Sequence, residues 1–316
     1  MRLLFAILLT AAAALAHAQA YPTKPVRMII PFPPGGSNDV VGRSISNQLA
    51  ERLGQGVVID NRGGAGGAIG IDAAAKAPAD GYTLLLISVS LPMNIGLGRI
   101  PQDALKAFAP VSMLGTGPAV LCVPAASPAS SLGELIALAK RKPGELNAAA
   151  AGIGSFQHLA TELFRLQAGI DFVIVQYKGG GPALTDLLAG QVQMNLGSLI
   201  QMLPHIRSGK LKALGVGGAK RSSALPDVPT LSEAGVPGYE ADNWWGILAP
   251  AGTPPAVLGR LQHDIDAVLE SPEMRKRFQA EGGDVLRMTP AAFGDFIGAE
   301  TAKWTRVVKQ AGIKPE

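Results

Sequence analysis

The chain has 316 residues, a formal net charge of +4 and a single cysteine, Cys122. Its charges are scattered in short clusters, and its few aromatic residues are not interleaved with them, so a nucleic-acid-binding surface is not indicated. One thiol cannot form an internal disulfide, and a chain of this length can bury enough apolar surface without one.

The first segment is typical of a secretory signal peptide. Arg2 supplies the charged start, residues 3–15 are apolar, and Ala16-His17-Ala18 forms a small-x-small cleavage site. The apolar stretch is short for a membrane span, although an uncleaved anchor is the alternative. We therefore expect residues 1–18 to be removed and the mature protein to be exported. Export without disulfides favours a bacterial periplasm.

Short apolar runs alternate with helical patterns along the rest of the chain, which favours an α/β fold with mainly parallel sheets. Strands are predicted at residues 26–31, 57–59, 82–87, 107–114, 119–123, 146–151, 172–175, 191–196, 211–216 and 244–249. Helices are predicted at residues 40–53, 69–76, 132–140, 159–168, 183–188, 255–269, 272–280 and 290–311. Ser37 or Asn38 is predicted to cap the first helix, with Asp39 in its first turn, where a negative charge suits the helix dipole.

One loop–helix–strand–helix–strand unit occurs twice. Gly36-Ser37 leads to Gly63-Gly64, and Gly154-Ser155 leads to Gly179-Gly180 at almost the same spacing. This repetition predicts two similar lobes with a ligand held between them. The last three helices belong to neither copy and are expected to pack back on the first lobe.

That arrangement requires the chain to cross between the lobes twice, around residues 117–124 and 243–250. We assign residues 19–122 and 247–316 to the first lobe and residues 123–246 to the second. A linear arrangement of two domains without a return crossing is the alternative.

The two glycine-containing loops are the candidate binding elements. Glycine lets a ligand approach the backbone closely, and a helix that starts at the loop adds free N–H donors and a partial positive charge. The first loop runs from Pro31 to Asp39, and the second from Ala151 to His158. Facing each other, they would suit a ligand with a carboxylate at either end. Ordinary strand-to-helix turns are the alternative interpretation.

Several side chains near the loops have two interpretations. Asp39 favours the helix start rather than contact with an anion, because like charges repel. His158 either donates to a ligand or serves a structural hydrogen bond. Lys178 either supplies positive charge at a strand end or faces solvent. Trp244 and Trp245 either line the cleft or pack in the core, and core packing is favoured.

Motifs of catalysis are missing. The chain has no G-x-S-x-G turn and no dinucleotide- or phosphate-binding glycine motif, and its histidines are not at metal-ligand spacing. We therefore expect no enzyme activity, no cofactor and no metal. An exported serine hydrolase that uses Ser37 or Ser155 as nucleophile is the alternative.

The chain resembles the periplasmic substrate-binding proteins of tripartite tricarboxylate transporters, the Bug family, over essentially its whole mature length. The similar segments are residues 21–27 (YPTKPVR), 31–37 (PFPPGGS), 58–62 (VIDNR), 80–84 (DGYTL), 108–112 (FAPVS), 154–155 with 157–160 (GS, QHLA), 177–179 (YKG), 182–192 (PALTDLLAGQV), 225–230 (LPDVPT) and 248–254 (LAPAGTP). Each is weak alone, but in this order they are specific.

The resemblance implies a two-lobed, flytrap-like (type II) periplasmic-binding-protein fold that binds a small carboxylate largely through backbone groups and bridging waters. It implies a receptor, expected to be a monomer, that makes transient contact with inner-membrane transporter subunits. A sensor with the same fold is a further possibility. The candidate ligand-binding residues are Phe32, Gly35, Gly36, Ser37, Asn38, Asp39, Ser88, Gly154, Ser155, Phe156, Gln157, His158, Lys178, Gly197 and Ser198.

The chain departs from the family pattern in two places. Many relatives carry acidic residues after the Gly-Gln-Val strand, whereas this chain has uncharged residues that include Gly197 and Ser198. A ligand that bears an ammonium group is therefore disfavoured. The His-containing segment common in the family is replaced within residues 88–99, which include Ser88 and Asn94. That loop is a further candidate for lining the pocket.

Overall fold

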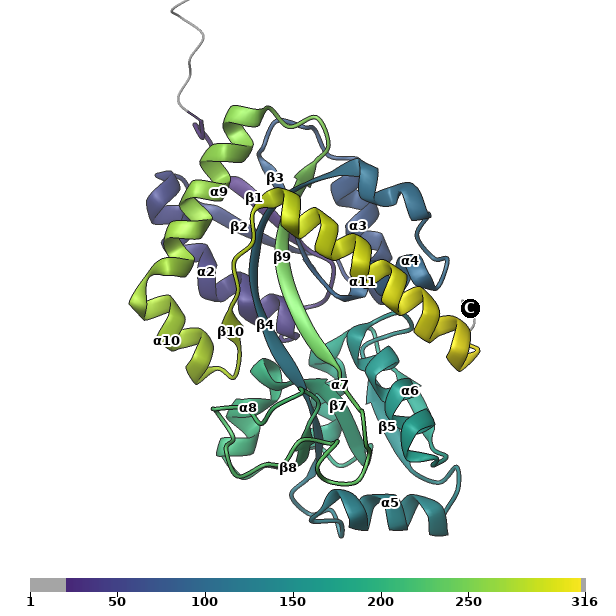
Figure 1. The fold of residues 1–316 in the computed structure, drawn as a ribbon. Helices are drawn as coiled ribbons and strands as arrows, with labels where there is room; N and C mark the ends of the chain where they lie inside the picture. The colour runs from purple at the N-terminus through teal and green to yellow at the C-terminus, as the bar shows by residue number, and fades with distance from the viewer. Residues whose placement is uncertain (1–20, 314–316) are drawn as a thin grey trace, which may run out of the picture.

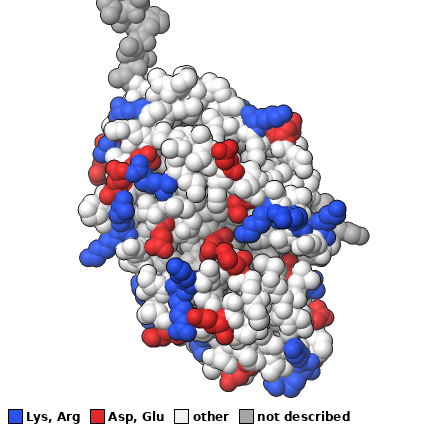
Figure 2. All heavy atoms as spheres, viewed as in Figure 1, with Lys and Arg blue, Asp and Glu red and all other residues white. Residues whose placement is uncertain are grey.

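The computed structural model describes residues 21–313 (Figure 1). The predicted signal peptide lies outside the described residues. Among the described residues, no helix has both the length and the apolar character needed to cross a membrane. On the face shown in Figure 2, Lys and Arg side chains are interspersed with Asp and Glu rather than gathered in a patch of one sign.

A curled, mixed sheet runs through the molecule, with strand order β2-β1-β3-β9-β4-β7-β5-β6. Its strands are β1 (Val26–Ile30), β2 (Val57–Asn61), β3 (Thr83–Ser88), β4 (Phe108–Pro124), β5 (Asn147–Ala150), β6 (Val173–Gln176), β7 (Met194–Ser198), β8 (Leu211–Val216), β9 (Asp242–Pro250) and β10 (Asp284–Val285). The outer triplets β2-β1-β3 and β6-β5-β7 are parallel. At the centre, β9 is antiparallel to β3 and β4, and β4 is antiparallel to β7 and β8. The prediction of mainly parallel sheets is therefore wrong for the centre, because two of its strands connect the lobes rather than belong to a β–α–β repeat.

The helices are α2 (Ser37–Leu53), α3 (Ala68–Ala75), α4 (Ser90–Gly96), α5 (Leu132–Arg141), α6 (Phe156–Ala168), α7 (Gly180–Leu188), α8 (Leu199–Arg207), α9 (Pro255–Glu270), α10 (Pro272–Ala280) and α11 (Pro290–Ala311), with short 3-10 turns at Ala65–Gly67 and Gln102–Ala107. Each helix predicted from the sequence is present within a few residues. The sequence pattern did not predict α4 or α8. Pro204 lies inside α8. Because a proline in a helix interior removes a backbone hydrogen-bond donor, its presence in the sequence argued against a helix at this position.

Two long strands, β4 and β9, carry the chain between the lobes (Figure 1). β4 pairs with β9 as far as Pro118, which lies opposite Asp242. From Ala119 onward it pairs with β7 and β8. The two strands predicted at 107–114 and 119–123 are thus one strand of 17 residues. The boundaries predicted after residues 122 and 246 stay a proposal.

The C-terminal helices return to the first lobe, where α9 contacts α2 and α11 contacts α4. The tryptophans stabilise this return. Trp245 is fully buried, and Trp244 packs edge-on against Phe293 and Phe296, with ring centroids 5.8 and 5.4 Å apart. The core-packing interpretation of both tryptophans is confirmed, and Cys122 is fully buried as well.

Candidate functional site

A small cavity of about 30 Å³ lies where the two lobes face each other. The first lobe and its crossing strand contribute one part of its lining: Phe32, Gly36, Ser37, Asn38, Ser88 and Asn243. The second lobe contributes the other part: Ala151, Ser155, Phe156, Gln157, Gly180, Ser198 and Gln201. None of these lining residues carries a formal charge.

The starts of α2, α6, α7 and α8 all contribute to the lining. A helix begins with backbone N–H groups that have no partner within the helix, and its dipole makes this end partly positive. Four such ends from two lobes create a neutral pocket that is rich in donors. An anion is the ligand type that this arrangement favours.

Two buried polar atoms in the lining have no hydrogen-bond partner in the structure. They are Nδ2 of Asn38, from the first lobe, and Oγ of Ser198, from the second. The two residues are only 3% and 1% exposed. Ser198 precedes α8 but its hydroxyl does not cap that helix. An unpaired buried donor costs about 1–3 kcal/mol, so such atoms at one cavity mark the place where a ligand completes the bonding.

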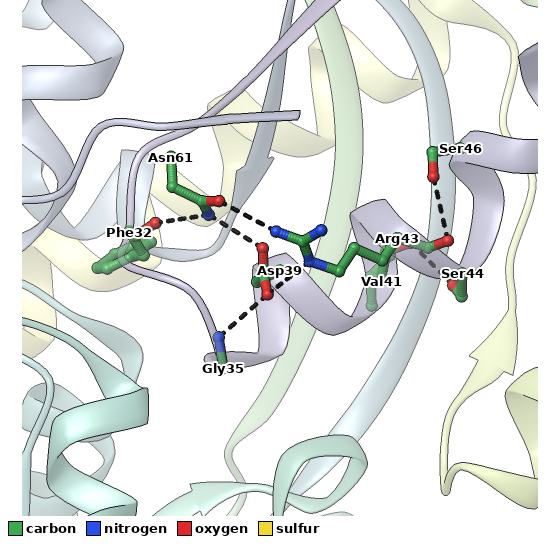
Figure 3. A network of polar contacts seen from close by, with 8 residues as sticks. All are labelled: Phe32, Gly35, Asp39, Val41, Arg43, Ser44, Ser46 and Asn61. Atoms are coloured by element: carbon green, nitrogen blue, oxygen red, sulfur yellow. Dashed lines mark hydrogen bonds and ion pairs between the residues drawn. The ribbon is translucent and has the colours of Figure 1, made fainter. Parts of the chain in front are cut away.

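The first loop is held by Asp39 and Asn61 (Figure 3). The Asp39 carboxylate accepts hydrogen bonds of 3.0 Å from Gly35 N, Arg43 Nε and Asn61 Nδ2. Asn61 Nδ2 also donates to Phe32 O at 3.0 Å. Burial alone would raise the pKa of Asp39, but these hydrogen bonds outweigh it and hold that pKa below its usual value. Asp39 therefore shapes the loop and does not itself line the cavity.

The start of α2 differs from the prediction. Gly36 occupies the N-cap position, and no side chain caps the helix. Ser37 is the first helical residue, and its Oγ accepts from Asn243 Nδ2 at 3.4 Å. The prediction that Ser37 or Asn38 caps this helix is wrong, because both lie inside it. Their side chains consequently face the cavity rather than the helix end.

The second loop is fixed by its own serine and histidine. Ser155 caps α6, since its Oγ accepts from the backbone N of His158 at 3.2 Å. The His158 ring is buried, and its Nδ1 accepts from Gly154 N at 3.3 Å. Burial, and then the cations of Arg99 and Arg165, lower the pKa of His158 to about 4. The ring is therefore neutral at pH 7 and does not line the cavity.

Of the other residues proposed from the sequence, Ser88, Phe156, Gln157 and Ser198 line the cavity. Gly154, Gly197 and Lys178 are not in its lining, and Lys178 is exposed. Gly35 lines a neighbouring groove.

Sequence reasoning missed the lining residues Ala151, Gly180, Gln201 and Asn243. The signal for Gly180 was the repeat itself, because Gly179-Gly180 is the Gly-Gly pair of the second copy. Gln201 depends on the unpredicted helix α8. Ala151 begins the second predicted loop, although it was not among the candidate ligand-binding residues. Asn243 reaches the cavity only through the tertiary fold and has no local sequence signal.

Direct contacts close the lobes around the cavity. Asn94 Nδ2 donates to Gly154 O at 3.2 Å, and Arg99 Nη1 donates to Ile153 O at 2.9 Å. On another side, a Cβ built on Gly179 would come within 2.5 Å of the Pro33 ring. These contacts between the two lobes define a closed arrangement.

An α/β fold with two lobes, joined by two long strands around a donor-rich cavity, is the architecture of a solute-binding protein. A model of the tripartite tricarboxylate transporter family receptor matches residues 41–313, and the chain belongs to this family. It is 44% identical to BugT of Bordetella pertussis over 305 residues, covering 96% of this chain and 94% of BugT.

Two solved structures extend the comparison. A protein of R. palustris solved with adipate has a TM-score of 0.88 and 35% identity, covering 93% of this chain and 99% of that chain. MatC of Rhodopseudomonas palustris, solved with bound malate, has a TM-score of 0.86 and 31% identity, covering 91% of this chain and all of that one. The family resemblance found in the sequence is confirmed, as is the two-lobed binding-protein fold.

Proposed function

We propose that this protein is a periplasmic receptor that captures a small carboxylate between its lobes for a tripartite tricarboxylate-type transporter. The observation that carries the proposal is the pair of unpartnered buried donors, Asn38 Nδ2 and Ser198 Oγ, which reach one cavity from opposite lobes. A carboxylate accepts several hydrogen bonds and suits both. The two family members solved with adipate and malate support the same ligand class.

The energetics are sufficient for a useful affinity. A hydrogen bond to a charged group contributes about 1.5–3 kcal/mol, and micromolar binding requires about 8 kcal/mol in total. A few bonds from the helix starts, Asn38 and Ser198 supply much of that. Enclosure by the two lobes strengthens these bonds, since the ligand is removed from water.

The same geometry argues against the alternative of a serine hydrolase. The Ser155 hydroxyl accepts a bond from the His158 backbone as a helix cap. Nδ1 of the His158 ring accepts from Gly154 N and is thereby occupied. A nucleophilic serine needs a base that accepts its proton, and this pair is arranged for structure instead. We therefore infer a binding protein without catalytic activity.

The remaining parts of the proposal concern export, oligomeric state, contact with the transporter and the lobe boundaries. We infer that residues 1–18 are a cleaved signal peptide, that the mature protein is a periplasmic monomer, and that it contacts its membrane transporter transiently. We keep residues 19–122 with 247–316 as the first lobe and residues 123–246 as the second.

Thermal-shift measurements on residues 19–316 test the proposal, with mono-, di- and tricarboxylates, aromatic acids and amino acids as probes. Ligand at 100 times its dissociation constant adds about 2.7 kcal/mol of stability. Stabilisation by at least one acid of the panel is expected. No shift with any carboxylate, at concentrations up to 10 mM or so, would contradict the proposed function.

The variant Asn38→Leu then tests the site. It removes the unpaired donor at similar volume, and we expect affinity for the stabilising acid to fall about tenfold or more, as measured by calorimetric titration. Asn47→Leu is the matched control, because Asn47 is exposed on the same helix. Equal affinity in both variants would remove Asn38 from the site.

A further inference from the structure

Three amide side chains form a continuous hydrogen-bonded chain in the second lobe, which we call the amide chain. Asn195 Nδ2 donates to Ala149 O at 3.2 Å and to Gln157 Oε1 at 3.4 Å. Gln157 Nε2 donates to Gln201 Oε1 at 3.2 Å. Gln201 Nε2 donates to Gly180 O at 2.7 Å. All three amides are 5% exposed or less.

The backbone determines the direction of the amide chain. Gly180 O can only accept, so Gln201 must turn its NH₂ group toward it and its oxygen toward Gln157. Gln157 must then donate with its own NH₂ and turn its oxygen toward Asn195. Asn195 uses both of its N–H groups, on Gln157 and on Ala149 O. Each amide therefore donates with its NH₂ group to the next acceptor, from Asn195 to Gln157, from Gln157 to Gln201 and from Gln201 to Gly180 O.

Both glutamines line the cavity, and each has one N–H left. Their oxygens are engaged within the amide chain. The side of the cavity that the two glutamines form, which we call the wall, therefore presents hydrogen-bond donors. The unpaired hydroxyl of Ser198 lines the same cavity and supplies a further donor. A carboxylate is stabilised by such a wall, whereas an ammonium group meets glutamine oxygens that already accept within the amide chain, so it gains less there than a carboxylate does.

The space beside Gly197 is already occupied. A Cβ built there would lie 2.6 Å from Met202 Cε and 2.7 Å from Asn195 Oδ1. No side chain can enter at this position without displacing Met202 or the amide chain. Gly197 therefore adds no side chain to the wall, and Gln157 and Gln201 are the members of the amide chain that line the cavity.

We propose that the amide chain makes Gln157 and Gln201 the specificity-determining residues of this receptor, selecting a ligand with a carboxylate and no ammonium group at the second-lobe end of the cavity. The inference rests on the proposed function and names the class of acid within it.

The test compares dissociation constants for diacids with those for amino diacids of the same chain length: succinate with aspartate, glutarate with glutamate, and adipate with 2-aminoadipate. The wild-type protein is expected to prefer the diacid of the pair that it binds. In Gln201→Glu a carboxylate replaces one donor of the wall. We expect the ratio of the two dissociation constants to shift toward the amino diacid by about tenfold or more.

A second variant covers the case in which a buried glutamate prevents folding. Gln201→Met keeps the length of the side chain, removes the donor and leaves Gly180 O free to accept. The same ratio should shift in the same direction by a smaller factor. Gln102→Glu is the matched control, because it makes the same chemical change at an exposed position and should leave the ratio unchanged.

The outcomes separate the two proposals. If neither member of any pair binds and no acid of the thermal-shift panel stabilises the protein, the proposed function is wrong, and the inference that rests on it is wrong as well. If the wild-type protein binds acids but prefers the amino diacid, the inference alone is overturned. An unchanged ratio in both Gln201 variants, each folded as judged by its melting curve, also overturns it.

Discussion

Asn38 and His158 show how polar residues of the two glycine-containing loops have different roles. Asn38 has a buried N–H group with no protein partner, which only a ligand or water can satisfy. His158, in the corresponding loop, has its ring nitrogen engaged by Gly154 N. The sequence left both interpretations of His158 open. Nothing in its local pattern reveals that the ring turns toward its own loop, because that depends on tertiary packing.

The buried His158 makes folding stability depend on pH. In the folded protein its pKa is about 4, whereas an unfolded imidazole takes up a proton near pH 6.5 or so. The unfolded state therefore binds more protons between these values, and stability falls as the pH falls through that window. We expect His158→Gln to abolish a loss on the order of 3 kcal/mol between pH 7 and 4.

Urea unfolding at a series of pH values measures this effect. The exposed His263 provides the control, and His263→Gln should retain the wild-type pH dependence. The interpretation is wrong if His158→Gln loses as much stability as the wild-type protein on acidification.

The starts of the last three helices were the most predictable boundaries of this fold. The last three helices begin at prolines, and the bounds of α10 and α11 agree with the sequence prediction, since proline in the first turn marks a helix start clearly. β4 was less predictable, because Gly115, Gly117 and Pro118 interrupt its pattern. These residues lie where β4 passes from one lobe to the other. Because β4 pairs with different strands on either side of this point, its alternation of buried and exposed residues does not follow one pattern along the sequence.

The docking of α11 on β9 depends on the ring of Phe293. This ring is fully buried, and a Cβ on Gly246 would overlap it, so strand and helix are in direct contact. Phe293→Ala should lower the free energy of unfolding by about 3–5 kcal/mol. Phe296 also contacts Trp244 but is only partly buried, so Phe296→Ala should cost less. Chemical denaturation that gave equal losses would contradict this account of how the helix is attached.

Closure of the two lobes brings the cavity walls together, and Gly66 is a contact point of that closure. Its φ is +63°, and a Cβ there would overlap the carbonyl oxygen of Ile153 on the opposite lobe. Gly66→Ala should therefore hold the lobes apart and weaken binding of the stabilising acid. Gly98→Ala is a matched control, because Gly98 has a φ of +73° but nothing within 4 Å of an added Cβ.

Small-angle scattering with and without that acid distinguishes the two variants. Gly98→Ala should contract as the wild-type protein does, and Gly66→Ala should not. Equal contraction and equal affinity would show that this contact does not limit closure.

The two-lobed architecture was predictable as a whole because the repeated unit and the family resemblance agree. The cavity was only partly predictable. Its residues Gly36, Ser37 and Asn38 lie where the loop after the first strand leads into the first helix, and the sequence marks that loop with glycines, whereas Gln201 and Asn243 come from an unpredicted helix and a crossing strand. Local sequence identifies a loop that can bind, but it does not identify which distant side chains face it.

A crystal structure of the protein with the acid that stabilises it most tests the central claim directly. A carboxylate of the ligand should lie in the cavity between the lobes, within hydrogen-bonding distance of Asn38 Nδ2 and Ser198 Oγ, with the helix starts directed at it. An acid bound outside this cavity, or inside it with both donors still unpaired, would contradict the account.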